Sequence, residues 1–415
     1  MFIYNYKVKE FITETLLILL AFTLPFSTRL NSFFLIMLFV NWLLQGEFKS
    51  KLKIVFEQKV LILLTLLYLA YLIGLLYTNN FNDALKILTK RSSFLILPIV
   101  VGSSSIKKIT FVKVSVAFIV AILIAANYSL IILFLEYWNK YKSFQDFELL
   151  YISRDYLSNP LELHPTYFSI YSLFAISLIV YLYIQFKKSN LNLIIVISTC
   201  LFLFCFSLLL SARMPLLGFI LISFIYLTTY LIIKRKYFLF VLLVVVTSAS
   251  LIKLYSHPLI NKRFAEIKET EWKPPVGIHH NSTNLRIGIF SCSSEAIKEY
   301  WLWGIGTGDV QDYLNNCYKS NNFSDVMYLN KYNTHNIYLD TLIMIGIFGL
   351  ILLFANFIFP AILALETKNY IYLFFLLFFC ICGLGEALFN TQKGVVFFSL
   401  FNCILLINQS RLNKS

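Results

Sequence analysis

Long runs of apolar residues follow one another along almost the whole chain. An apolar helix of about 20 residues is long enough to cross a hydrocarbon core of roughly 30 Å. We count about twelve such runs, and they lack the short alternation of apolar and polar residues that is typical of a transmembrane β-barrel. The pattern therefore predicts an all-α, polytopic membrane bundle of about twelve transmembrane helices. The approximate limits of the runs are 11–27, 30–46, 60–78, 93–103, 111–137, 166–186, 191–210, 215–233, 237–254, 336–359, 369–389 and 394–409.

Two of these runs need comment. The run 93–103 is short, contains Pro98 and follows the amphipathic stretch "FNDALKILTKRS", so we expect a half-span or a broken helix there. The run 11–27 has no small-residue cleavage site at its end. We therefore expect it to be retained as the first span and not removed as a signal peptide.

Basic residues orient the predicted bundle, because lysine and arginine accumulate in the cytoplasmic loops of membrane proteins. Alternation of the spans collects most of them on one side, which predicts that both termini lie in the cytoplasm. These residues are Lys7, Lys9, Lys49, Lys51, Lys53, Lys59, Lys107, Lys108, Lys187, Lys188, Lys234, Arg235, Lys236, Lys368, Arg411 and Lys414. The opposite loops contain few basic residues: Arg29, Arg213, Lys393 and an exceptional group of Lys86, Lys90 and Arg91.

Two long polar segments, 139–165 and 255–334, then face outward. The second is far longer than an ordinary connection and precedes the tenth span. We therefore divide the chain into an N-terminal transmembrane bundle (1–254), a large periplasmic loop (255–334) and C-terminal transmembrane spans (335–415). Within the loop, "NLRIGIFSCSSEAIKEYW" has the apolar spacing of an amphipathic helix, and "GIGTGDVQDYL" reads as a glycine-rich turn that leads into another helix.

Composition supports a membrane protein, since 59% of the residues are hydrophobic and only 13% are charged. The net charge of +14 is explained by flanking lysines that set orientation, so membrane lipids are expected partners and nucleic acid is not. The chain has no internal repeat of the kind that many transporters show.

Five of the seven cysteines lie within predicted spans, where they are most simply small apolar residues. Cys292 and Cys317 both fall in the long outer loop. In an oxidising compartment they can form a disulfide, and the alternative is two unpaired thiols.

Charged residues near membrane depth are costly to keep there and are therefore candidates for function. Arg213 lies in "LLLSARMPLLG", a tight turn between two spans on the outer side. It is either an interfacial arginine that reaches the headgroups or a fixed cation directed into the bundle. Arg286 begins the amphipathic helix, where a contact with a lipid headgroup is the alternative.

His335 and Asn336 lie where the long loop re-enters the membrane. Thr334 or Asn336 can cap the helix that follows. A histidine in this partly dry place suits a general base or a hydrogen-bond donor to an oxyanion. Asp340 lies one helical turn after Asn336, where it can orient the site or hydrogen-bond to a neighbouring helix.

Other titratable residues give weaker signals. His164 and Tyr167 lie at the outer end of the sixth run, beside Pro165 as a helix start. His279 and His280 resemble a metal pair only superficially, because adjacent residues do not face the same way on a helix and no cluster of further ligands accompanies them. The sequence has neither a phosphate-binding loop nor a dinucleotide fingerprint. We therefore expect neither a metal site nor a cofactor.

Two outward arginines and an outward histidine indicate an anionic substrate at the membrane surface, because arginine binds diphosphate bidentately and keeps its charge. A sugar linked to polyprenyl diphosphate fits this description. The diphosphate would leave against the guanidinium groups, and the histidine would take the proton of an acceptor hydroxyl.

At this point the motifs resemble a known family. The segments "THNIYLDTLIMIGIFGLILLF", "SARMPLLG", "NLRIGIFSCSSEAIKEYWLWGIGTGDV" and "GEALFNTQKGVVFFSLFNCILL" are similar, in this order, to segments of the bacterial O-antigen ligase and O-antigen polymerase superfamily of membrane glycosyltransferases. The resemblance covers roughly the second half of the chain, whereas the first half is similar only in hydropathy.

The resemblance implies roles for three residues. Arg213 and Arg286 would bind the lipid-linked diphosphate, and His335 would activate the acceptor. The chain departs from the family at Met344, where other members often have a glutamate, and Asp340 or Glu386 is a candidate to replace it. Implied partners are an undecaprenyl-diphosphate-linked glycan and, as acceptor, lipid A–core or a growing glycan, in the bacterial inner membrane.

The family includes ligases, repeat-unit polymerases and relatives that glycosylate proteins. We favour a metal-independent O-antigen ligase of lipopolysaccharide biosynthesis over a polysaccharide polymerase, although the shared motifs do not separate the two. The single long outer loop and the absence of repeats support a glycosyltransferase. The alternative of another class is a polysaccharide or lipid transporter without catalysis. It predicts charges at mid-bilayer positions, whereas the centres of the runs are mostly uncharged, with Glu386 as the main exception.

Overall fold

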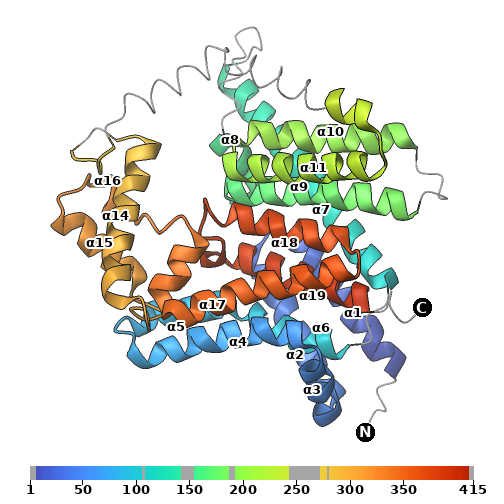
Figure 1. Ribbon diagram of the computed structural model, residues 1–415, viewed down its shortest axis with the longest axis horizontal. Coiled ribbons are helices and arrows are strands. Elements are labelled where there is room, and N and C mark those ends of the chain that lie inside the picture. Colours follow the sequence, from blue (N-terminus) through green and yellow to red (C-terminus); the bar gives the residue numbers. More distant parts are fainter. Residues whose placement is uncertain are drawn as a thin grey trace.

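The computed structural model describes residues 6–104, 108–141, 154–186, 192–242, 272–277 and 280–410. In these ranges the chain is all helical and contains no strand. Figure 1 shows a bundle of long helices with α14, α15 and α16 gathered at one end and the two chain termini at the other. The helices are α1 (Tyr6–Thr23), α2 (Thr28–Gln45), α3 (Phe48–Glu57), α4 (Lys59–Ile73), η1 (Gly74–Tyr77), α5 (Phe81–Arg91), α6 (Ser93–Ser103), α7 (Lys108–Tyr141), α8 (Arg154–Ser158), η3 (Asn159–Leu161), α9 (Pro165–Gln185), α10 (Leu193–Leu209), α11 (Arg213–Ile233), α14 (Ser282–Tyr300), α15 (Val310–Ser320), α16 (Val326–Leu329), α17 (Ile337–Glu366), α18 (Tyr370–Cys382), η4 (Leu388–Asn390) and α19 (Gln392–Ser410).

Five of the described helices are long and apolar enough to cross a membrane, namely α4 with η1, α7, α9, α11 and α17. A sixth span results if α2 and α3, which are bent by 119° at their junction, count as one. Three further apolar helices, α10, α18 and α19, are shorter. The chain is therefore a multi-pass membrane protein, while the number of twelve spans stays a prediction. The run 237–254 lies largely outside the described residues.

The run 93–103 forms the short helix α6, which continues through Pro98 without a break. Two short helices, α5 and α6, follow each other around Ser92 and replace one continuous span. Gln58, at the start of α4, donates a hydrogen bond of 3.0 Å to the carbonyl of Gly102 at the end of α6. The pair α5–α6 thus runs back along α4, and Arg91 lies at their junction.

The uniform hydropathy of the run 336–359 predicts one continuous helix, but the structure contains a kink there. Within α17, Ile345 and Gly346 leave the helical conformation, and Gly346 has a φ of 68°. A Cβ atom at Gly346 would lie 2.2 Å from the carbonyl oxygen of Leu302, so only glycine fits this approach. Irregular backbone at membrane depth is tolerated where other parts of the protein cover it.

The covering segment is the turn that follows α14. The N–H of Ile305 donates to the carbonyl of Ile343 at 2.8 Å, and the N–H of Ile347 donates to the carbonyl of Trp301 at 2.9 Å. Gly304 lies so close to Met344 that a Cβ would be 2.5 Å from its carbonyl oxygen. The glycine-rich turn read from the sequence therefore satisfies the backbone groups that the break in α17 leaves open.

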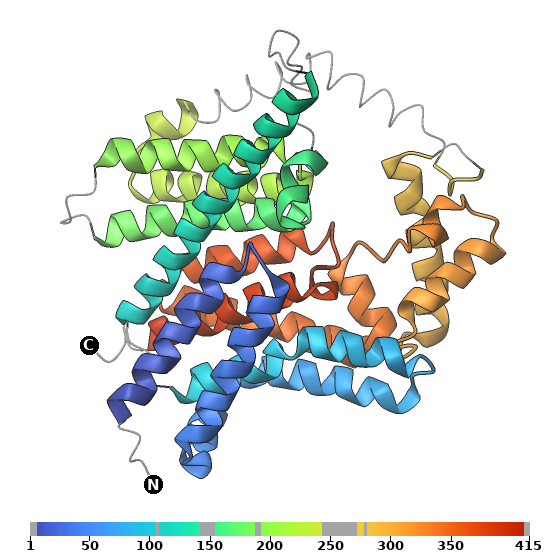
Figure 2. The same cartoon turned by 180° about the vertical axis from the view of Figure 1, so that it is seen from behind.

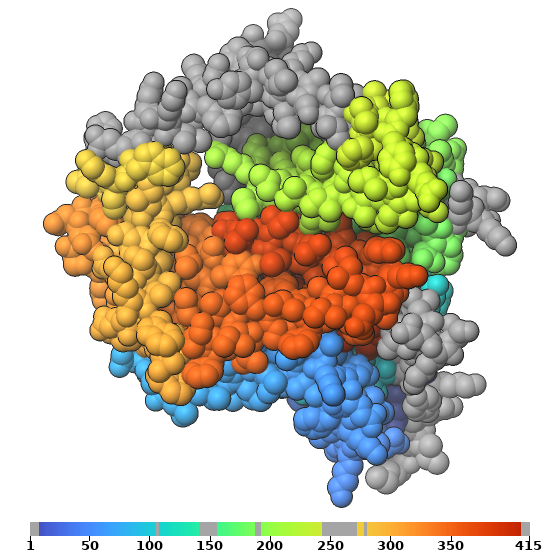
Figure 3. All heavy atoms as spheres, viewed as in Figure 1, coloured from blue at the N-terminus to red at the C-terminus, as the bar shows by residue number. Residues whose placement is uncertain are grey.

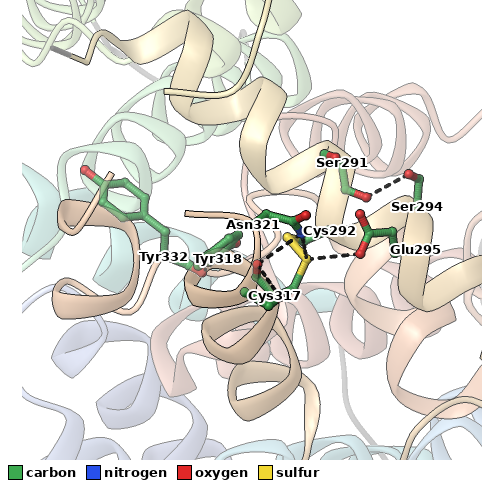
Figure 4. The surroundings of a disulfide bond; sticks show 9 residues. Ser291, Cys292, Ser294, Glu295, Cys317, Tyr318, Asn321 and Tyr332 are labelled. Atoms are coloured by element: carbon green, nitrogen blue, oxygen red, sulfur yellow. Dashed lines mark hydrogen bonds between the residues drawn. A yellow bond between two sulfur atoms is a disulfide. The ribbon is translucent and has the colours of Figure 1, made fainter. Parts of the chain in front are cut away.

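Helices α14, α15 and α16 form a unit that we call the cap. The predicted amphipathic helix is α14, which begins with a capping box at Asn281, and the helix predicted after the glycine-rich turn is α15. Cys292 of α14 and Cys317 of α15 are joined in a disulfide (Figure 4). The space-filling view shows the cap packed against the C-terminal helices (Figure 3). The three-part division of the chain stays a prediction.

A cluster of phenylalanine rings fixes the helices that carry the site. Its ring centroids lie 4.9 to 6.3 Å apart, a spacing typical of favourable aromatic pairs. The cluster joins α7 and α9 to α18 and α19, and thereby holds the turn between α18 and α19. Its members are Phe118, Phe174, Phe375, Phe397 and Phe401.

Candidate functional site

The turn between α18 and α19, residues 383–391, is the point at which several helix ends meet. The N–H of Ile337 donates to the carbonyl of Gly383 at 2.9 Å, and the side-chain amide of Asn336 donates to the carbonyl of Leu384 at 3.2 Å. These bonds place the start of α17 on the 383–391 turn. Asn336 caps that helix as well, because its side-chain oxygen accepts from the N–H groups of Tyr338 and Leu339.

His335 directs its Nδ1 at the carboxylate of Glu386 on this turn. The distance from Nδ1 to Oε1 is 3.4 Å, and the two side chains are 30% and 12% exposed. His335 has a φ of 44°, and its N–H donates to the side-chain oxygen of Asn333 at 2.8 Å. A non-glycine residue rarely adopts this backbone conformation, so the surrounding contacts must stabilise it. The backbone conformation and the contact with Glu386 together set the position of the imidazole. The ring of Tyr332, 5.8 Å away between centroids, flanks it.

The charge on Glu386 is stabilised by its surroundings. Burial raises the pKa of Glu386, but the hydrogen bond from His335 and the attraction of His335 and His164 lower it further, so the pKa lies below its ordinary value of 4.5. A carboxylate that stays ionised can orient the imidazole and stabilise its protonated form. Glu386, which the sequence analysis named as a mid-span exception and as a candidate to replace the family glutamate, therefore lies in the candidate site.

Asp340 forms a second pair with Arg91, whose guanidinium lies 3.3 Å away and is fully buried. The other oxygen of Asp340 accepts from Thr334 at 3.2 Å and from Asn390 at 3.0 Å. The sequence left two roles open for Asp340, which are to orient the site or to hydrogen-bond to a neighbouring helix. The structure contains the second contact, with Arg91 of α5.

Arg91 is bound on every side. Its Nε donates to the carbonyl of Phe389 at 3.2 Å, one Nη donates to Asn390 at 3.1 Å, and the guanidinium stacks 3.9 Å from the ring centre of Tyr71. The Sδ of Met344 lies 3.1 Å from its other Nη. Sequence reasoning recorded Arg91 only as an exception in the charge pattern. The signal that identifies it is a charge at the end of the amphipathic helix α5, directly before the short apolar helix α6.

His164 and Tyr167 approach the same turn from the start of α9. The hydroxyl of Tyr167 donates to the carbonyl of Leu388 at 3.2 Å, and His164 caps the helix through a 3.4 Å contact with the N–H of Thr166. Pro165 begins the helix, as predicted. His164 also contributes to the electrostatic environment of Glu386. Both residues thus lie around the 383–391 turn.

Arg213 is exposed and begins α11 after a tight turn in which Ser211 has a φ of 52°. Its neighbour Met214 packs against Gly385, where an added Cβ would lie 2.3 Å from the Met214 Cγ. The first turn of α11 therefore lies on the 383–391 turn, next to Glu386.

Arg286 is exposed on the cap and not on the turn itself. Two residues later, Gly288 packs against Met327, and the carbonyl of Met327 accepts from the N–H of Tyr332 at 2.9 Å. The cap is thereby connected to the segment that leads into His335. Arg286 lies on the cap, and no contact joins it to the 383–391 turn within the described residues. Six other residues predicted from the sequence lie around this turn: His335, Asn336, Asp340, His164, Tyr167 and Arg213.

A family model described as O-antigen ligase matches residues 198–354, which is less than half of the chain. The match supports a relation of this chain to the O-antigen ligase superfamily. Members of this superfamily are glycosyltransferase-like membrane enzymes. No curated protein is similar enough in sequence to be matched to the chain.

The O-antigen ligase match covers only part of the site. It includes Arg213, Arg286, His335 and Asp340, and it ends before Glu386. Arg91, His164 and Tyr167 also lie outside it. The charged partners of His335 and Asp340, which are Glu386 and Arg91, therefore come from parts of the chain that the family match does not reach.

The site was expected from the sequence to contain no metal ion. Among the residues that the structure describes, there is no group of three or more histidine, cysteine, aspartate or glutamate side chains arranged to hold a metal ion. His279, one of the two adjacent histidines, lies outside the described residues. The charged and titratable side chains that the structure brings together at the site are the imidazole, carboxylate and guanidinium groups described above.

Proposed function

We propose that this protein transfers a glycan from a polyprenyl-diphosphate carrier to an acceptor hydroxyl at the outer face of the bacterial inner membrane, as an O-antigen ligase. The observation that supports this most directly is the His335–Glu386 pair, partly exposed at a turn where several helix ends meet. The family domain supplies the class of reaction, a transfer from a lipid-linked glycan.

In the proposed reaction, His335 is the general base. Its Nδ1–H is directed at Glu386, so Nε2 is the nitrogen that takes the proton from the acceptor hydroxyl. The acceptor oxygen forms a bond to the anomeric carbon while the bond from that carbon to the diphosphate oxygen breaks. The diphosphate leaves with the electron pair, the proton stays on His335, and Glu386 stabilises the imidazolium that results.

Arg213 and Arg286 are proposed to bind the diphosphate. Guanidinium groups bind phosphate oxygens bidentately and can neutralise the charge that develops on the leaving group. The position of Arg213 beside the 383–391 turn supports a role at the site over a headgroup contact alone. Arg286, on the cap, would approach the diphosphate from the opposite side.

The orientation of the bundle is part of the proposal. A disulfide forms and persists in an oxidising compartment, so the Cys292–Cys317 bond supports a cap that faces the periplasm. The chain termini lie at the other end of the bundle in both views (Figure 2), which supports their placement in the cytoplasm. The distribution of lysine and arginine along the sequence predicts the same cytoplasmic placement of both termini.

The test is glycan transfer by the purified protein in lipid nanodiscs. We expect His335→Ala to reduce the transfer rate by about 10²- to 10⁴-fold, the usual contribution of a general base, with an unchanged thermal unfolding midpoint. The matched control is His280→Ala, which removes an exposed histidine of the cap region. Wild-type transfer in His335→Ala would remove this residue from the mechanism.

Ligase, polymerase and transporter differ in their products. A deletion strain of a ligase accumulates lipid-linked polymer that is not attached to lipid A–core. Loss of a polymerase leaves core that bears a single repeat unit. Vectorial movement of the lipid-linked glycan in proteoliposomes, without covalent transfer, would instead favour a transporter.

A further inference from the structure

A cavity of about 850 Å³ opens between the cap and the connection from η1 to α5. It is separate from the 383–391 turn and plays no part in the reaction proposed above. Three segments that are far apart in the sequence build its walls: the η1–α5 connection, the glycine-rich turn and α15. The lining residues are Tyr77, Asn79, Asn80, Phe81, Asn82, Tyr300, Gly304, Ile305, Asp309, Asp312, Tyr313 and Asn316.

The walls of this cavity are held together by a carboxylate. Asp309 accepts hydrogen bonds from the hydroxyl of Thr78 at 3.0 Å and from the N–H groups of Asn79 and Asn80 at 2.8 and 2.7 Å. Asp312 accepts from the side-chain amide of Asn80 at 2.6 Å. The cavity is thus a built feature of the fold and not a chance gap between loops.

Glycine allows the two walls to approach. A Cβ atom at Gly308 would lie 2.0 Å from the carbonyl oxygen of Asn80, and Gly306 has a φ of 111°. No other residue type fits the first position without moving the backbone, and the second favours glycine. The motif "GIGTGD" therefore serves two purposes, since Gly304 also packs on the break in α17.

The free groups in the cavity are amides and aromatic rings. Within the described residues, the side-chain amides of Asn79, Asn82 and Asn316 have no hydrogen-bond partner. The rings of Tyr300 and Tyr313 lie edge to face with centroids 6.0 Å apart. Amides that both donate and accept, next to aromatic faces, suit a sugar, whose hydroxyls form hydrogen bonds and whose C–H faces pack on rings.

Charge narrows the class of ligand. Two carboxylates, Asp309 and Asp312, line the cavity, and its lining contains no lysine, arginine or histidine. Phosphorylated groups are therefore disfavoured here, in contrast to the arginines proposed to bind the diphosphate. Neutral sugars and amino sugars fit the lining.

A second cavity, of about 510 Å³, adjoins the first. The two share Tyr77, Tyr300 and Gly304, and the second is lined in addition by Leu302 and the largely exposed Trp303. Exposed tryptophan is typical of the boundary between membrane and water. We therefore infer that the polar cavity lies close to that boundary, where a membrane-anchored glycan begins.

Helix α15 connects the cavity to the proposed site. Asp312, Tyr313 and Asn316 of α15 line the cavity, whereas Gln311 and Tyr318 both donate hydrogen bonds of 3.2 Å to the carbonyl of Tyr332. The ring of Tyr332 flanks His335. Helix α15 thus lies between the cavity and the segment that leads to His335. Because a helix is about 10 Å wide, we expect only a glycan of more than one sugar to reach both.

We propose that this cavity is a saccharide subsite that holds neutral or amino-sugar units beyond the bond that is made or broken at His335. The role in transfer depends on the proposed function, but the binding of sugar does not. The saccharide can belong to the donor glycan or to the acceptor, and the experiment separates these two sources.

The first measurement is direct binding. Neutral oligosaccharides, released by mild acid from the lipid-linked glycan of the host, are tested on the full-length protein in nanodiscs by saturation-transfer NMR. We expect Asn82→Ala/Asn316→Ala to weaken binding by about tenfold or more, because each lost hydrogen bond contributes about 1 kcal/mol. Both side chains are exposed, so folding is preserved. The control is Asn315→Ala, on the same helix but outside the cavity lining.

The second measurement is transfer with donors and acceptors of increasing sugar length. If the subsite serves the donor, the double variant raises KM about tenfold for long donors only and leaves kcat and short donors unchanged. If it serves the acceptor, the same change appears along the acceptor series. Oligosaccharide binding that is equal in wild type and double variant would overturn the subsite, even with transfer intact. Variant-sensitive binding without any transfer would leave the subsite standing and remove the proposed function.

Discussion

Two ion pairs flank the first turn of α17, and they differ mainly in their access to solvent. The side chains of Arg91 and Asp340 are 0% and 4% exposed, whereas those of His335 and Glu386 are 30% and 12% exposed. The first pair is enclosed by fixed hydrogen bonds and contains an arginine, which does not lose its proton. The second contains a histidine, which can. The comparison indicates that one pair holds the helix in place and the other is available for proton transfer.

The buried pair also explains the departure from the family pattern at Met344. The Sδ of Met344 lies 3.1 Å from the guanidinium of Arg91, so a carboxylate at this position would face the same cation. In this chain, Asp340, one helical turn earlier, is the carboxylate that pairs with Arg91. Of the two candidates to replace the glutamate, the geometry favours Asp340, and Glu386 is paired with His335 instead.

The largest effect is expected from breaking the buried pair. Arg91→Met leaves Asp340 buried without its partner, and we expect a loss of about 3–5 kcal/mol in the free energy of unfolding. The measurement is thermal unfolding in detergent micelles. Replacing both partners, as Arg91→Met/Asp340→Leu, should recover much of the loss, because a buried pair can be exchanged for apolar residues at little cost.

Lys86→Met is the matched control for this prediction. Lys86 lies on the same helix as Arg91, and its side chain is 70% exposed beside Asp83. An exposed pair of this kind contributes at most about 1 kcal/mol. Equal unfolding midpoints for Arg91→Met and Lys86→Met would show that the Arg91–Asp340 pair does not anchor α17.

A change in the partly exposed His335–Glu386 pair should lower the rate of glycan transfer and leave the free energy of unfolding nearly unchanged. Glu386→Gln keeps the shape of the side chain but removes the charge that orients His335, and we expect kcat for glycan transfer to fall about 10- to 100-fold. The unfolding midpoint should change little. The opposite result, a large drop in the midpoint with unchanged kcat, would reverse the roles assigned to the two pairs.

The sequence predicted the elements better than the contacts between them. The membrane class, the amphipathic helix of the cap and the helix starts at Pro165 and Asn336 follow from local patterns, and the structure contains them. The break at Gly346 was missed because apolar residues continue through it. It depends on a backbone contact with Leu302, which hydropathy does not report.

The partners of the site were the hardest part to predict. Arg91 and Asp340 are 249 residues apart, and no local pattern links them. Glu386 lies 51 residues after His335, in a turn that the hydropathy pattern assigned to the apolar run 369–389. His335 itself was found because a histidine before an apolar helix is visible in the sequence. The groups that hold it are visible only in the fold.

The smallest effect concerns pH. Because the pKa of Glu386 in the folded protein lies below its ordinary value of 4.5, its contribution to stability is complete above that pH and is lost as the pH falls through the folded pKa. We compare the free energies of unfolding of wild type and Glu386→Gln from pH 7 to pH 3. We expect them to differ by less than about 1 kcal/mol at neutral pH and to converge in acid. A constant difference down to pH 3 would mean that Glu386 is not an ionised partner of His335 and His164, and the electrostatic distinction between the two pairs would fail.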